Sequence, residues 1–132
     1  ARDGNTLPPS YYEHPVVQAS PADCDVYPLS LYMDATPFVR HDSAVGVWVR
    51  CMLLNTHHLV AVLRKGELCQ CACKHWCSNA TLFEFLRWSI ESMGLGVWPS
   101  CRHDMSLFGD SDTTRTVMAG GQLKWRAAVV FV

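Results

Sequence analysis

Alternating apolar and polar positions mark three strands in the first half of the chain. The run VYPLSLYMD (26–34) predicts a first strand that buries its apolar side chains and ends on Asp34. The run SAVGVWVRCMLL (43–54) has apolar residues at alternate positions, so these share one face of a second predicted strand. After a short turn, HLVAVLRK (58–65) predicts a third strand that runs back alongside it. We therefore predict an antiparallel meander of three strands.

A helix and a last strand follow the meander. Apolar residues recur at helical spacing over 81–94, where Thr81 and Glu84 predict a capping box and Gly94 predicts the helix end. The run LKWRAAVVFV (123–132) is apolar almost throughout, which predicts a buried strand in the centre of the sheet. This order of elements describes the front half of an RNase H-like fold. The predicted fold class is α+β or α/β, a partial RNase H-like fold truncated at the C-terminus.

The chain divides into an arm and one domain. Residues 1–25 are rich in proline and polar residues, which predicts an extended arm held by the domain or by a partner. Residues 26–132 are predicted to form a single truncated RNase H-like domain with a cysteine-rich insert at 69–77. A chain of 132 residues is about one domain in size, and an apolar fraction of 49% is enough for a packed core.

Charge and hydropathy restrict the classes of partner. The formal net charge is −1, so the chain as a whole lacks the basic field typical of nucleic-acid-binding proteins, and phosphate contacts would rest on local clusters. No apolar run approaches the roughly 20 residues of a membrane span, and the first residues lack a signal-peptide pattern. We predict an intracellular protein without a membrane partner. Its odd count of seven cysteines argues against a complete disulfide framework.

The densest chemistry lies in CQCACKHWC, which supplies Cys69, Cys71, Cys73 and Cys77. Four thiolates form a standard structural zinc site, but Zn–S bonds of about 2.3 Å require the sulfurs to lie within about 4 Å of one another. Alternate residues of an extended strand lie about 6.6 Å apart, so the segment must coil into a turn to bind one ion. Structural zinc, a disulfide within the cluster and free packed thiols are the three alternatives.

Residues near the cluster extend these alternatives. A ligand from Cys51, Cys101 or His103 could replace one of the four thiols, because zinc sites usually join two separated pairs. A bound zinc ion would brace the junction between the hairpin and the helix, and only His75 hints at the nearby base that a catalytic zinc needs. We expect Trp76 to fill the core instead of offering a stacking surface.

Three motifs carry a family resemblance: LRK followed by C.C.C...WC, then FLRWS, then WP..RHD. With them, residues 10–132 resemble a transposase-like domain of uncharacterised dinoflagellate sequences and, more distantly, the catalytic domain of CACTA-type DDE transposases. The resemblance implies two-metal phosphoryl transfer on DNA, with Asp34 as the first carboxylate and Mg²⁺ or Mn²⁺ as the metal. It also implies a nuclear location. Ala35 departs from the glycine that follows this aspartate in such domains.

A single carboxylate does not make a two-metal site. The second is expected beyond Val132, so we predict that this chain is inactive by itself. Asp42 and Asp104, the latter beside His103, are the substitutes that their positions suggest. The plainer alternative is that Asp34 only begins a turn at DATP, because aspartate and proline both favour turns.

Two function classes follow from these observations. The first is a fragment of a transposase-like or integrase-like phosphoryl-transfer domain, with DNA as the partner of the full-length protein. The second is a non-catalytic zinc-binding module that acts as a subunit of a larger assembly. Such a module would contact other protein subunits through the N-terminal arm and the last strand.

Overall fold

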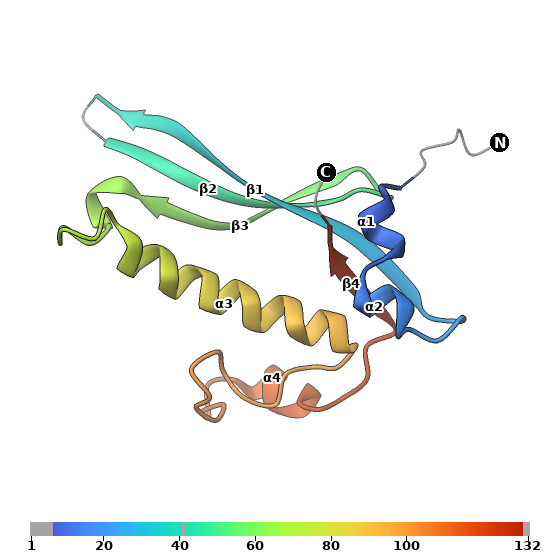
Figure 1. The fold of residues 1–132 in the computed structure, drawn as a ribbon. Coiled ribbons are helices and arrows are strands. Elements are labelled where there is room, and N and C mark those ends of the chain that lie inside the picture. Colours follow the sequence, from blue (N-terminus) through green and yellow to red (C-terminus); the bar gives the residue numbers. More distant parts are fainter. Residues whose placement is uncertain (1–6, 41, 131–132) are drawn as a thin grey trace.

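Four strands form one mixed sheet in the computed structural model, which describes residues 7–40 and 42–130. The strands are β1 (Asp25–Val39), β2 (Asp42–Cys51), β3 (Thr56–Arg64) and β4 (Trp125–Val129), in the spatial order β3-β2-β1-β4. The first three form the predicted antiparallel meander, and β4 lies parallel to β1 (Figure 1). The α+β class and the predicted order of elements are confirmed.

One long helix covers a face of this sheet. The helical elements are α1 (Pro9–Tyr12), α2 (Pro15–Gln18), the 3-10 turn η1 (Lys65–Glu67), α3 (Trp76–Leu95) and α4 (Thr113–Met118). Helix α3 connects β3 to β4 and runs along the sheet, and the segment that contains α4 lies beyond it (Figure 1). Leu29, Cys51 and Ala127 are buried beneath the helix, where Met93 packs against them.

Strand β1 has two different neighbours along its length. Its first part, Asp25–Leu29, pairs with β4, and its second part, Leu29–Val39, pairs with β2. Among the described residues, Leu29 is the one position shared by both ladders. The β1/β2 hairpin therefore projects past the end of β4 (Figure 1).

The prediction that the first strand ends at Asp34 is wrong. Strand β1 continues to Val39, and Asp34 pairs with Gly46 of β2. Strand β2 supplies a paired residue at each step as far as Pro37 opposite Ser43, and this cross-strand pairing overrides the local turn preference of DATP. Asp34 is an exposed mid-strand side chain, neither a strand-end carboxylate nor a turn residue.

Helix α3 is longer than predicted at both ends. It begins at Trp76, so Thr81 lies inside the helix and its hydroxyl donates to the Cys77 carbonyl oxygen at 3.2 Å; the predicted capping box is wrong. Gly96, with φ of 72°, ends the helix in the left-handed conformation. Gly94 instead lies within α3, where a Cβ would stand 3.7 Å from the Ala127 carbonyl oxygen, so the helix packs directly on β4.

Strand β4 lies at the edge of the sheet, not in the centre as predicted. Its apolar sequence has another cause: α2 and α3 both contact the strand, and Ala127 and Ala128 are each only 1% exposed. An edge strand that helices cover can therefore have as apolar a sequence as a central strand. Residues 131–132 of the predicted strand lie outside the described residues.

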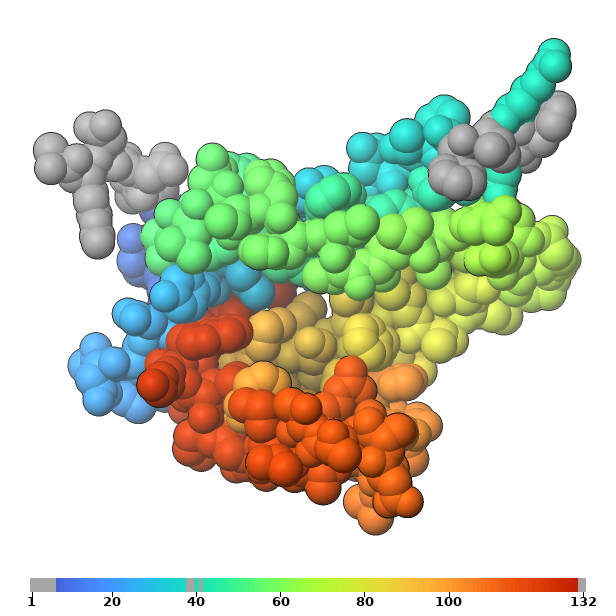
Figure 2. All heavy atoms as spheres, turned by 180° about the vertical axis from the view of Figure 1, so that it is seen from behind, coloured from blue at the N-terminus to red at the C-terminus, as the bar shows by residue number. Residues whose placement is uncertain are grey.

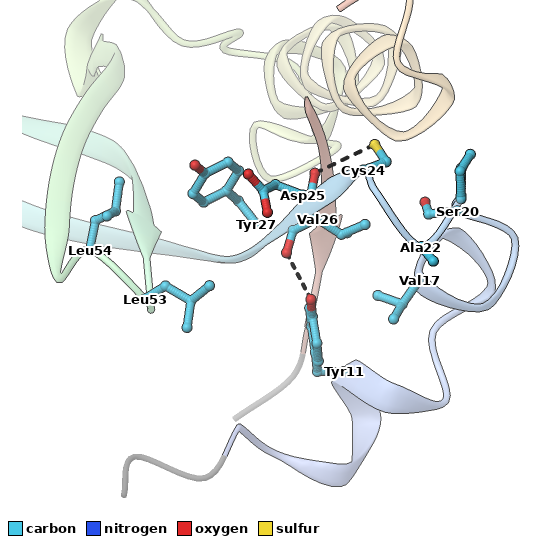
Figure 3. Close-up of a pocket in the computed structure, with 11 residues that line it drawn as sticks. Tyr11, Val17, Ser20, Ala22, Cys24, Asp25, Val26, Tyr27, Leu53 and Leu54 are labelled. Carbon is cyan, nitrogen blue, oxygen red and sulfur yellow. Dashed lines mark hydrogen bonds between the residues drawn. The ribbon is translucent and has the colours of Figure 1, made fainter. Parts of the chain in front are cut away.

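The N-terminal segment is not the extended arm that was predicted. Over residues 7–24 it forms α1 and α2, and His14 caps α2 by accepting the Val16 N–H at 3.2 Å. The Tyr11 hydroxyl donates to the Val26 carbonyl oxygen at 2.8 Å, which fastens the segment to β1 beside a cavity of about 650 Å³ (Figure 3). The rest of the predicted arm, residues 1–6, lies outside the described residues.

Candidate metal centre

The four cysteines of the insert converge at the start of α3. Cys69, Cys71 and Cys73 lie in the turn after η1, and Cys77 lies in the first turn of the helix. Their Sγ atoms are all within 4.8 Å of one another. The Sγ of Cys73 is 2.8 Å from that of Cys71, 3.2 Å from that of Cys69 and 3.4 Å from that of Cys77. The segment does coil as a one-ion site requires.

Backbone conformation and three hydrogen bonds hold this turn. Lys74 and His75 adopt left-handed conformations with φ of 51° and 68°, which reverse the chain just before the helix. The Cys69 N–H donates to the Ser78 hydroxyl at 2.9 Å, and the His75 Nδ1 lies 2.8 Å from the Cys69 carbonyl oxygen. The Cys77 N–H points at the Cys73 sulfur at 3.4 Å, so the helix N-terminus faces the cluster. A negative thiolate is favoured at this end of the helix dipole.

The four cysteine thiols of the cluster differ in pKa. A hydrogen bond from the Cys71 thiol, together with the Cys77 N–H, lowers the pKa of Cys73 to about 6. The hydrogen bond between Cys77 and Cys73 raises the pKa of Cys77 to about 12, and the bond to Cys73 also raises the pKa of Cys71. The Ser78 N–H lowers the pKa of Cys69. The first thiolate therefore forms at Cys73, which contacts the other three sulfurs.

The donor set fits a tetrahedral thiophilic ion. All seven cysteines of the chain are free thiols, and the cluster brings four of them together. Zn–S bonds of about 2.3 Å place the sulfurs of a tetrahedral site about 3.8 Å apart. Four sulfur contacts measure 2.8–3.7 Å and no pair is further apart than 4.8 Å, so shifts of about 1 Å or less would reach that spacing. Soft thiolate ligands favour Zn²⁺ or Cu⁺ over Mg²⁺ or Ca²⁺.

The alternative ligands lie elsewhere. Cys51 is buried in the core beneath α3, and the His103 ring packs edge-on against Phe85 and Trp88 at centroid distances of 5.6 and 6.4 Å. The Cys101 sulfur lies 4.0 Å from the Met105 sulfur in the same loop. Among the described residues, the four insert cysteines are the one group of three or more metal-ligand side chains close enough to share an ion.

The structure does not bring the predicted carboxylates together. Asp34 lies opposite Gly46 on β2. Asp42 lies four residues before Gly46 on that strand, which separates it from Gly46 by about 13 Å at the spacing of a strand. Asp42 accepts hydrogen bonds from the Ser43 and Gly66 N–H groups and from Arg64. Two-metal sites require ions about 4 Å apart, so this pair cannot form one.

Asp104 is occupied within its own loop. Its carboxylate accepts the Ser106 hydroxyl at 2.6 Å and the Ser106 N–H at 3.0 Å, and these bonds lower its pKa. Its neighbour His103 packs against α3, whereas the alternation of β1 places Asp34 on the opposite face of the sheet from Leu29 and the helix. Asp34 and Asp104 therefore lie on different sides of the molecule.

Beside the cluster, sequence reasoning misjudged Trp76 and missed two supporting roles. Trp76 does not fill the core: it is 64% exposed at the start of α3, beside the cluster. The supporting roles of Ser78 and His75 depend on the turn, and a serine next to the last cysteine was the only sequence signal for them.

The fold and the site define an α+β protein with a surface tetrathiol cluster at a hairpin–helix junction. Comparison with known protein families, curated proteins and solved structures finds no match to this chain. Among the described helices, none combines the length and apolarity that a membrane crossing requires.

Proposed function

We propose that this chain is a non-catalytic module whose four-cysteine cluster holds one structural zinc ion. The observation that carries the proposal is the convergence of the Cys69, Cys71, Cys73 and Cys77 sulfurs within 4.8 Å. Four thiolates complete a tetrahedral zinc site and leave no open position for substrate, which is the arrangement of structural zinc.

The ion would join two consecutive elements of the chain. Three ligands follow the end of β3 and η1, and the fourth belongs to α3, so one ion would fix the direction in which the helix leaves the hairpin. The turn also contains two consecutive non-glycine residues in the left-handed region, Lys74 and His75, and each is disfavoured by about 1 kcal/mol or more. Metal binding would offset this conformational cost.

Exposed apolar side chains support the further proposal that the module serves a larger assembly. Trp76 stands beside the cluster, and Tyr32, Leu59 and Val62 are each at least 40% exposed on the strands. Tyr32, Trp48 and Leu59 are adjacent across β1, β2 and β3 in the strand register, and an exposed apolar patch on a sheet commonly marks a protein contact. The zinc ion would keep the helix and the hairpin in fixed relative positions for such contacts.

Metal analysis tests the zinc proposal. Protein purified without added metal should hold about one zinc per chain, and Co²⁺ substitution should produce the charge-transfer absorption of a tetrathiolate complex. Cys73→Ser should abolish that absorption, whereas the matched variant Cys101→Ser, outside the cluster, should retain it. Less than about a tenth of an equivalent of zinc, with all four thiols titratable, would contradict the proposal.

RNase H-like phosphoryl transfer is the second candidate. The strand order β3-β2-β1-β4, with α3 crossing from the meander to a parallel β4, supports it. In the β1/β4 ladder Asp25 pairs with Trp125 and Leu29 with Val129, so a β4 continued in this register would run beside Asp34. A carboxylate there would give, with Asp34, the pair that holds Mg²⁺ or Mn²⁺ on a DNA substrate.

Manganese binding tests this second candidate. Extending β4 so that an aspartate lies opposite Asp34 should create Mn²⁺ binding, measured by paramagnetic resonance titration, and Asp34→Asn should abolish it. The substitution removes the charge at an exposed position and nearly preserves shape, so we expect the protein to fold as before. Unchanged Mn²⁺ affinity in the extended Asp34→Asn protein would refute the role of Asp34.

A further inference from the structure

A second site lies between α3, the chain that follows it and the start of β4. The chain after the helix folds back against it, and Figure 2 shows this lobe, which contains α4, lying against α3 below the hairpin. Between the lobe and the helix is a cavity of about 340 Å³. This volume is within the range of about 300–1,000 Å³ that is usual for small-molecule sites, at its lower end.

Backbone hydrogen bonds fix the walls of the cavity. The Trp98 N–H donates to the Gly121 carbonyl at 2.8 Å, and the Gly120 N–H donates to the Trp98 carbonyl at 3.0 Å. The Asp112 carboxylate accepts from the Arg102 guanidinium at 2.5 Å and from the Gly109 N–H at 3.1 Å, which closes the middle of the loop. The cavity is thus preformed by ordered backbone.

The lining is aromatic with one cation. It includes Phe85, Trp88, Trp98, Phe108, Trp125 and Arg115. The Trp88 indole N–H is already bonded to the Cys101 carbonyl oxygen at 3.1 Å, so its ring offers an apolar surface. Phe85, Trp98 and Trp125 are 38–39% exposed, a large fraction for residues that a packed core would bury.

Arg115 supplies a positive charge at this aromatic lining. Its side chain is 60% exposed, and its Nη1 lies 3.6 Å from the Asp112 carboxylate. That carboxylate takes its shorter contact from Arg102, so the Arg115 guanidinium retains donors for another anion. A fork of N–H donors matches the geometry of a carboxylate.

We propose that this cavity binds a small planar aromatic anion, with its ring among the tryptophan and phenylalanine side chains and its carboxylate at Arg115. Stacked and edge-on contacts favour a flat ring over a flexible chain, and the volume suits a compact ring system. The site shares no residue with the cysteine cluster, so its failure would leave the proposed zinc function intact.

Matched probes test the site by isothermal titration calorimetry on the full chain. 2-Naphthoate should bind saturably, and 2-naphthamide, which keeps the ring and loses the charge, should bind about fivefold more weakly. Octanoate, which keeps the carboxylate on a flexible chain, should also bind more weakly. Equal affinity for naphthoate and naphthamide, tighter binding of octanoate, or no saturation up to about 1 mM naphthoate would each overturn the proposal.

Variants locate the binding. Arg115→Gln should remove the preference for naphthoate over naphthamide, whereas Arg87→Gln, a matched change at an exposed arginine paired with Glu91 on α3, should leave it unchanged. Ser92→Phe should fill the cavity and abolish binding of both probes while circular dichroism stays native. A full naphthoate preference in Arg115→Gln, or undiminished binding in a folded Ser92→Phe protein, would place the ligand elsewhere and refute the inference.

Discussion

Cys73 lies at the centre of the cluster, within 3.4 Å of the other three sulfurs. Its lowered pKa, about 6, means that a thiolate is present at neutral pH before any metal arrives. An incoming cation would meet that thiolate first, because the thiolate is the ligand form of cysteine. Cys71 and Cys77, whose pKa values are raised, would lose their protons only as the ion binds.

Metal affinity should therefore increase with pH. Binding must displace the protons of Cys71 and Cys77, and each displaced proton strengthens binding about tenfold per pH unit below the pKa of that thiol. We expect the apparent zinc affinity, measured by competition with a chelator of known protonation, to rise steeply between pH 6 and 8. An affinity that does not vary with pH over this range would mean that the thiols are not the ligands.

At the scale of elements, the limits of helix α3 show what the sequence could predict. Helical periodicity identified the helix, although both predicted ends, Thr81 and Gly94, lie inside it, and alternation identified the three strands of the meander. The true helix start lies five residues earlier than Thr81. The chain turns through Lys74 and His75, and the hydrogen bonds from the Cys69 N–H to the Ser78 hydroxyl and from the Cys77 N–H to the Cys73 sulfur hold the helix start at Trp76. Those contacts depend on the folded insert, which local sequence does not encode as a cap.

Pairing between segments that are distant along the chain could not be predicted from local sequence either. Asp34 belongs to a strand that continues because β2 lies beside it, and β4 is apolar because helices cover it at the edge of the sheet. The coiling of the cysteine segment was predicted only as the condition for binding one ion, from the length of the Zn–S bond. The aromatic cavity could not be anticipated, since its walls come from α3, a long loop and the start of β4.

The glycine that ends α3 can be tested for its contribution to the free energy of unfolding. Gly96→Ala should destabilise the protein by about 1 kcal/mol, because Gly96 has φ of 72° and a Cβ would meet the Arg126 side chain at 3.0 Å. Gly109→Ala is the matched control: its Cβ would stand 3.4 Å from the flexible Arg102 guanidinium. Urea unfolding measures both free energies, and equal values would contradict the importance of the left-handed helix end.

On the scale of the whole molecule, the proposed zinc centre and the packed core lie at opposite ends of α3. The cluster surrounds the first turn of the helix, whereas Met93, near the other end, packs on Leu29, Cys51 and Ala127. The core itself is assembled from β1, β2, β4 and the end of α3. Metal loss should therefore loosen one end of the molecule and leave the other end intact.

Hydrogen exchange can resolve this local effect. After chelation, amide exchange should accelerate over residues 69–80, where the turn and the first helical turns depend on the cluster, while β1, β2 and the end of α3 stay protected. A uniform rise across the sheet would show that the ion supports the global fold instead. The Cys73→Ser protein should reproduce the pattern of the chelated protein without any chelator.

The change of partners at Leu29 also has a mechanical consequence. Beyond this residue the β1/β2/β3 meander projects without support from β4. Before Leu29, β1 is hydrogen-bonded to β4, and after Leu29 it is hydrogen-bonded to β2. A sideways force on the tip, near Pro37, would bend the sheet at this overlap, because Leu29 is the one described position at which the two ladders meet. In single-molecule pulling, we expect the tip to yield at a lower force than the β1/β4 root, so that the hairpin acts as a compliant arm on a stiff base.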